Sequence, residues 1–195
     1  MKNQIIELSG SCYYNMLRAS IEEPKEVTGY LYGRRERKRI ILYNAYPIQT
    51  AIRNPTNVAY GNQSAIERLR KLDAAISKTF GLETYLIGGF HSDPSLDGLN
   101  GLSKKDINFI AKEEVCPLKK DIWIEIVLKL EEKNYKRPMK IKEFSEEFKK
   151  RLKVTIIDDE YHSYKITISA HELDKNNKVR ELKIKKRKIR VIKIE

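Results

Sequence analysis

The strongest constraint on the fold is the apolar run Tyr85–His91, which contains two adjacent glycines. A short apolar run with glycines and without a helical period is typical of a strand buried in the middle of a sheet. Such a strand needs neighbours, and apolar segments of strand length lie before and after it. We expect these further strands at residues 27–32, 40–46, 122–130, 154–157 and 164–169, and alternating apolar and basic residues predict one more from residue 178 onward.

Helical spacing of apolar residues occurs between the expected strands. It predicts helices at residues 11–21, 63–80 and 103–115, and one more, carrying Ile141, Phe144, Phe148 and Leu152, in a segment inserted at about residues 131–152. The expected fold class is therefore α/β of the α+β type, with a mixed, mostly antiparallel curved sheet flanked by two or three helices. The 195 residues suit a single domain, which ends in a basic strand region at about residues 178–195.

The charge balance indicates the kind of partner. The chain has 39 Lys and Arg against 27 Asp and Glu, a formal net charge of +12, which favours nucleic acid, an anionic membrane surface or an acidic protein. A surface of ion-pair networks, as in thermophilic proteins, explains the excess equally well. The tail Lys183–Arg190 alternates apolar and basic residues and has no aromatic residue to stack on bases. It therefore favours an edge strand kept soluble by basic side chains, and nucleic-acid binding is the weaker alternative.

The cysteines and the hydropathy indicate where such a protein works. Cys12 and Cys116 are too few for a disulfide framework and show no catalytic pairing with a histidine. The first residues contain no signal-peptide core, and no run of about 18 apolar residues occurs. We therefore expect a cytoplasmic protein without a membrane-spanning segment. His162 and His171 have no partners at ligand spacing and are interpreted as structural.

Residues around the end of the central strand have the chemistry of metal ligands. His91 and Asp93 are two residues apart, so their side chains point the same way on a strand. Asp106 lies in the first turn of the next expected helix, and the loop between them could bring it to the same point. One histidine and two aspartates leave a position of a tetrahedral zinc ion for water, as in catalytic sites. Asp97, in the loop, is an alternative to Asp93.

A hydrolytic site also needs an acid that takes a proton from metal-activated water and passes it to the leaving amine. Glu26 stands just before an expected strand, although Glu22 or Glu23 would serve equally well by residue type. Ser103 lies one helical turn before Asp106, where its hydroxyl could donate to the oxyanion of a tetrahedral intermediate. Ser103-x-x-Asp106 is also a helix-capping pattern, and taken alone it favours the cap.

These motifs together resemble those of the JAMM (MPN-domain) metalloprotease family, which has a distant Glu, then His-x-His-Pro, then Ser-x-x-Asp. Glu26 precedes residues 29–33 (Gly-Tyr-Leu-Tyr-Gly), a context typical of that family. Residues 91–94 (His-Ser-Asp-Pro) and residues 103–106 (Ser-Lys-Lys-Asp) follow in the same order. The resemblance extends over nearly the whole chain, except about residues 131–152.

The resemblance implies a cytidine-deaminase-like MPN architecture with a zinc site. It implies that His91 and Asp106 bind the zinc, with Asp93 at the second ligand position. It implies Glu26 as general base and Ser103 as a transition-state donor. The implied activity is that of an isopeptidase or peptidase that hydrolyses amide bonds at the C-terminal tail of a ubiquitin-like or sulfur-carrier protein.

One position departs from the family motif, because Asp93 stands where the family has a histidine. A second carboxylate makes the site formally neutral with a divalent ion and favours harder ions, so manganese or another divalent ion is the alternative to zinc. The alternative function is a catalytically impaired MPN scaffold module that binds protein partners. The apolar stripe of the inserted helix could then dock a partner subunit, and a homo-oligomer is left open as well.

Overall fold

The computed structural model describes residues 4–23, 26–48, 52–54, 57–59, 71, 74–75, 78–79, 81, 84–93, 101–112, 121–137, 145–159 and 161–187. Along these residues the elements are β1 (Ile5–Leu8), α1 (Gly10–Glu22), β2 (Thr28–Arg35), β3 (Arg39–Pro47), β4 (Ile52–Asn54), β5 (Asn57–Ala59), β6 (Tyr85–Asp93), α3 (Lys104–Ile110), β7 (Ile122–Asn134), β8 (Ser145–Phe148), β9 (Arg151–Asp159), β10 (His162–Asp174) and β11 (Val179–Lys186). The described positions of the helix expected at residues 63–80 are Lys71, Ala74, Ala75, Lys78 and Thr79, which are helical.

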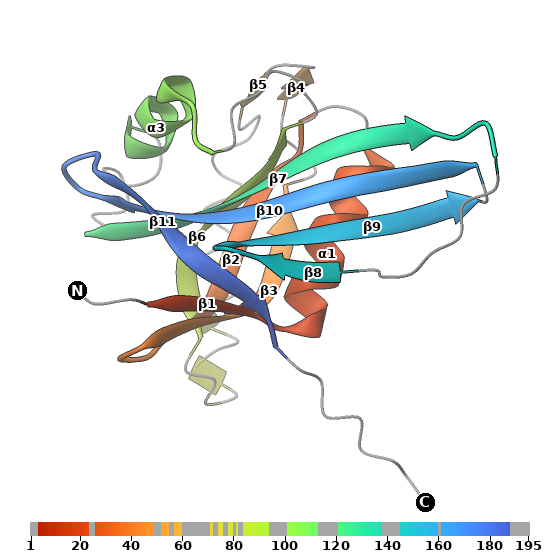
Figure 1. The fold of residues 1–195 in the computed structure, drawn as a ribbon. Helices are drawn as coiled ribbons and strands as arrows, with labels where there is room; N and C mark the ends of the chain where they lie inside the picture. Colours follow the sequence, from red (N-terminus) through yellow and green to blue (C-terminus); the bar gives the residue numbers. More distant parts are fainter. Residues whose placement is uncertain are drawn as a thin grey trace, which may run out of the picture.

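Seven strands form a closed barrel in the order β11-β1-β3-β2-β6-β7-β10, and β10 pairs again with β11 (Figure 1). β1 is parallel to both of its neighbours, β6 is parallel to β7, and the other pairs of the ring are antiparallel. β6 lies between β2 and β7, so the prediction that Tyr85–His91 is a central strand is confirmed.

The closure of the ring corrects the expected fold class. The prediction of a curved sheet flanked by two or three helices, in an MPN architecture, is wrong, because β11 bonds β1 on one side and β10 on the other. The basic tail strand is therefore not an edge strand where the structure describes it. Leu182 and Ile184 are 3% and 1% exposed and belong to the inner apolar cluster, so the alternation in this segment is that of a barrel strand.

The helix expected near Phe148 and Leu152 is also wrong in its described part. Ser145–Phe148 and Arg151–Asp159 form a hairpin that turns at Lys149, where φ is 56°. The spacing of apolar residues crosses this turn, so its helical period is a coincidence. β9 and β8 extend the sheet outward from β10 beyond the ring (Figure 1). Ile141 and Phe144 lie outside the described residues.

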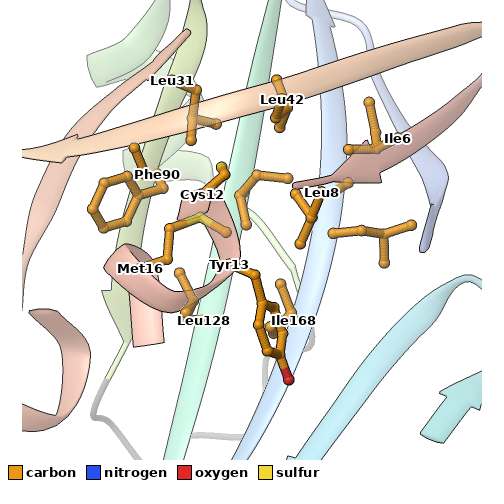
Figure 2. Packing of buried hydrophobic residues seen from close by; sticks show 14 of the residues in the cluster. Ile6, Leu8, Cys12, Tyr13, Met16, Leu31, Leu42, Phe90, Leu128 and Ile168 are labelled. Atoms are coloured by element: carbon orange, nitrogen blue, oxygen red, sulfur yellow. The ribbon is translucent and has the colours of Figure 1, made fainter. Parts of the chain in front are cut away.

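Helix α1 packs against the inner face of the barrel. Ser9 caps it, because the Ser9 hydroxyl accepts a hydrogen bond of 3.1 Å from the Cys12 amide. Figure 2 shows Cys12 and Met16 among apolar side chains from the strands, and both are fully buried. Burying one large apolar side chain stabilises a fold by about 1.5–3 kcal/mol, so the helix and the ring stabilise each other. Burial raises the pKa of Cys12 to about 12, so this thiol stays protonated.

Helix α3 covers part of the opposite, outer face. Ile107, Phe109 and Ile110 of α3 belong to a second apolar cluster with Tyr30 of β2 and Trp123 of β7. Strand neighbours of these residues, such as Ile124, belong to the inner cluster. Alternate residues of a strand point to opposite faces, so this part of the sheet is covered on both sides. Neither α1 nor α3, among the described residues, is long and apolar enough to cross a membrane.

If β11 is a structural part of the barrel, truncating its inward side chain should be costly. Ile184→Ala should lower the free energy of unfolding by about 2–5 kcal/mol, the usual range for a buried isoleucine. Val179→Ala, on the same strand but with a side chain that is 39% exposed, should cost less than about 1 kcal/mol. Urea unfolding of both variants measures the difference, and equal small losses would contradict the closed ring.

Candidate functional site

The site begins with His91 on β6. Phe90 beside it belongs to the inner cluster, so His91 points to the outer face, on which α3 packs. Its backbone pairs with Thr28 of β2 and with Val127 of β7. His91 is only 7% exposed, so its ring nitrogens need partners within the protein.

Glu125 of β7 provides one of these partners. His91 Nδ1 lies 2.8 Å from Glu125 Oε1, and the indole N–H of Trp123 donates to Glu125 Oε2 at 2.7 Å. A carboxylate can only accept, so His91 Nδ1 carries the hydrogen and donates it. Glu125 is 4% exposed. A buried carboxylate is tolerated when it is paired and hydrogen-bonded, and both of its oxygens have a donor here.

A glycine of the central strand makes room for this carboxylate. Gly89 pairs with Glu125 across the parallel β6–β7 ladder. A Cβ atom at Gly89 would lie 2.9 Å from Glu125 Oε2 and 3.2 Å from Trp123 Cζ2. One of the two glycines that mark this strand in the sequence is therefore required by the buried acid beside it.

The charges around His91 decide its protonation. Burial alone would lower the pKa of His91, but the hydrogen bond and the charge of Glu125, together with the charges of Asp106 and Glu26, raise the pKa to about 9. Three carboxylates from different elements thus act on one imidazole. The site therefore favours positive charge at this position.

Glu26, just before β2, shares this environment. Burial raises the pKa of Glu26, as do the negative charges of Asp106 and Asp93, while His91 and Lys105 act in the opposite direction. A carboxyl group with a raised pKa suits proton transfer near neutral pH. The structure therefore brings Glu26, His91, Asp93 and Asp106 within electrostatic reach of one another, although they come from three separate segments.

Ser103 and Asp106 form the N-terminal cap of α3. The Asp106 amide donates to Ser103 Oγ at 3.1 Å, and the Ser103 amide donates to Asp106 Oδ2 at 2.7 Å. This reciprocal pair is a capping box, so the capping interpretation of Ser103-x-x-Asp106 is confirmed. The box uses one carboxylate oxygen and only the acceptor side of the hydroxyl. Asp106 Oδ1 and the Ser103 hydroxyl hydrogen are not used by the cap.

The three ligands expected from the sequence, His91, Asp93 and Asp106, all lie among the described residues. Asp93 ends β6 opposite Lys129 of β7, and Asp97 lies outside the described residues. Within the described part of the chain, no group of three or more His, Cys, Asp or Glu is placed so that it could hold a metal ion. The structure thus brings the predicted residues near one another without a complete set of three ligands.

Sequence reasoning missed Glu125. A signal for it exists, because Glu125 is the one charged residue in the apolar run Ile122–Leu128. A lone charge in the middle of an apolar strand is expected to be buried and to need a partner. The partner could not be found this way, because His91 lies 34 positions earlier in the chain.

His171 lies next to this pair. It stands directly across the β7–β10 ladder from Glu125, and its Nε2 lies 3.0 Å from the hydroxyl of Ser169. His171 is 4% exposed, and burial lowers its pKa to about 4. His162, the other histidine interpreted as structural, lies 2.8 Å from Glu132 through its Nε2.

Comparisons with known proteins concern the fold. The chain is similar to the solution structure of protein DSY2949 from Desulfitobacterium hafniense, with a TM-score of 0.57, 16% sequence identity and 94% of each chain covered. At this identity the likeness shows the fold alone. No protein-family model matches the sequence, and no curated protein matches it.

The buried neutral His171 predicts a loss of stability in acid. Its pKa in the folded protein is about 4, below the ordinary 6.5, so the unfolded chain binds the proton first as the pH falls. The contribution of His171 is complete above pH 6.5 and is lost toward pH 4, by roughly 2–3 kcal/mol. Urea unfolding at pH 7.0 and pH 4.5 should show a flatter pH dependence for His171→Gln. Equal pH dependence in both proteins would contradict this account.

Proposed function

We propose that this protein is a metal-dependent amide hydrolase, an isopeptidase or peptidase. The single observation that carries the proposal is the convergence of Glu26, His91 and Asp106. These residues come from three separate segments, and each acts on the protonation of another. A buried imidazole among carboxylates, one of which has a raised pKa, is the kind of group that general acid–base catalysis uses.

The donor types near His91 are those that bind divalent ions, and we propose that a bound ion would draw them together from the positions that the structure shows. Because His91 Nδ1 is held by Glu125, Nε2 is the nitrogen available as a ligand. Asp106 offers Oδ1, since Oδ2 accepts the Ser103 amide. Asp93 is the third candidate, with Asp97 as its alternative. A nitrogen and carboxylate oxygens suit zinc, and the oxygen-rich set also accepts manganese.

In the proposed hydrolysis, Glu26 and Ser103 have different roles. A bound divalent ion would supply a Lewis acid that polarises the scissile carbonyl and eases the deprotonation of water. Glu26 takes the proton from the attacking water and returns it to the leaving amine. Ser103 donates its hydroxyl hydrogen to the oxygen of the substrate on which negative charge develops.

The charge of the chain supports an acidic protein substrate. The net charge of +12 would attract an acidic protein. The resemblance to JAMM metalloproteases, which concerns the motif and not the architecture, suggests the tail of a ubiquitin-like or sulfur-carrier protein. The cysteines and the N-terminal residues favour a cytoplasmic location.

The test combines metal analysis with hydrolysis. The protein is dialysed against zinc or manganese, its metal content is measured, and cleavage of a ubiquitin-like protein joined by an isopeptide bond is followed. We expect one ion per chain and cleavage. Glu26→Gln should keep the ion and lose at least about 100-fold in turnover, because the proton acceptor is gone.

A control separates loss of the base from loss of a charge. The control is Glu36→Gln. Glu36 lies at the opposite end of β2 from Glu26 and pairs with Arg34 and Arg39. The turnover of this variant should therefore match that of the unchanged protein. No cleavage with either ion at full occupancy would overturn the proposal. Failure to bind an ion at all would favour the scaffold module that binds protein partners instead.

A further inference from the structure

We infer that Glu125 is a positioning residue for His91, which it holds with Nε2 as the only ring nitrogen that can bind a metal ion. This inference rests on the proposed function. It names a residue outside the predicted motif, on β7, that acts on the ion through another side chain.

The imidazole of His91 has two nitrogens that could bind a metal ion. Either can carry the hydrogen in the neutral ring, and the partner of one nitrogen decides which of them is left to bind a metal. Glu125 Oε1 accepts from His91 Nδ1 at 2.8 Å, and this bond fixes both the tautomer and the orientation of the ring. Without it the neutral ring could place its hydrogen on Nε2, and a ligand would be lost.

Glu125 can hold the ring because Glu125 is itself fixed. The Trp123 indole holds the second carboxylate oxygen at 2.7 Å, and the missing Cβ of Gly89 leaves space for it. The side chains of His91 and Glu125 are 9% and 5% exposed, so water competes little for the bond. In such an environment a charge-assisted hydrogen bond is stronger than at the surface.

The negative charge of Glu125 favours metal binding by His91, as its hydrogen bond to Nδ1 does. A carboxylate that accepts from a histidine makes the other nitrogen more electron-rich and a better ligand. It also adds negative charge next to Asp106 and Glu26, which favours a divalent cation at this end of β6. Partners of this kind change metal affinity by about 10–100-fold in proteins where they have been removed.

The test measures zinc binding by isothermal titration calorimetry in full-length variants. Glu125→Gln should weaken zinc binding by about 10–100-fold. Trp123→Phe leaves His91 and Glu125 in place and removes only the indole donor, so it should weaken binding by a smaller factor. It also serves as the second variant if Glu125→Gln does not fold.

Glu172→Gln is the matched control. Glu172 is a similarly buried glutamate on the neighbouring strand β10, at 8% exposure, and it bonds Arg180 rather than His91. Its replacement should destabilise the fold without changing zinc affinity. If Glu125 had only a structural role, Glu125→Gln would behave in the same way as this control.

A second readout identifies the bound nitrogen. The ¹⁵N chemical shifts of His91 in the zinc-loaded protein distinguish binding through Nε2 from binding through Nδ1. We expect Nε2 in the unchanged protein and in Glu172→Gln, and a mixture in Glu125→Gln. Unchanged zinc affinity in Glu125→Gln, or binding through Nδ1 in the unchanged protein, would overturn the inference and leave the proposed function intact. No zinc binding in the unchanged protein would overturn both.

Discussion

The closure of the seven-stranded ring is the constraint on which the rest of the structure depends. Each ring strand has a neighbour on both sides, so its side chains can point only inward or outward. The inside is filled mainly by apolar residues and by α1. His91 and Glu125 alternate with Phe90 and Ile124 of the inner cluster, so they are on the outer face, on which α3 packs.

The positions of the strands could be predicted from the sequence, whereas the ring could not. Alternation with a period of two is a local property, so the strands at Tyr85–His91 and Ile122–Leu130 are predicted correctly. Alternation tells which face a residue occupies, but not which strand lies next to it. The contact that closes the ring therefore left no mark in the pattern of β11. The helix expected through Phe148 failed for a related reason, since apolar residues on both sides of a tight turn imitated a helical period.

The candidate site was likewise predictable in its local motifs but not in its contacts between strands. His91, Asp93, Ser103 and Asp106 are close together in the sequence, and their residue types and spacing are enough to suggest metal chemistry. Ser103 and Asp106 also form the capping box at the N-terminus of α3. The same two residues therefore stabilise the helix and have a role in the proposed metal site. Glu125 could not be linked to His91, because their bond joins the neighbouring strands β6 and β7, and the sequence does not determine which strands are neighbours.

The parallel pairing of β1 with β11 has a consequence for how the chain folds. Ile5 pairs with Lys183, so the ring joins residues that are 178 positions apart. Contacts of such large sequence separation form slowly, because the entropy of closing a long loop is lost before the contact stabilises it. During synthesis, the edges of β1 and β10 that receive β11 stay exposed until the last ring strand has emerged. Open strand edges are the surfaces through which unfinished chains associate. The nascent protein is therefore prone to aggregate for as long as these two edges remain unpaired.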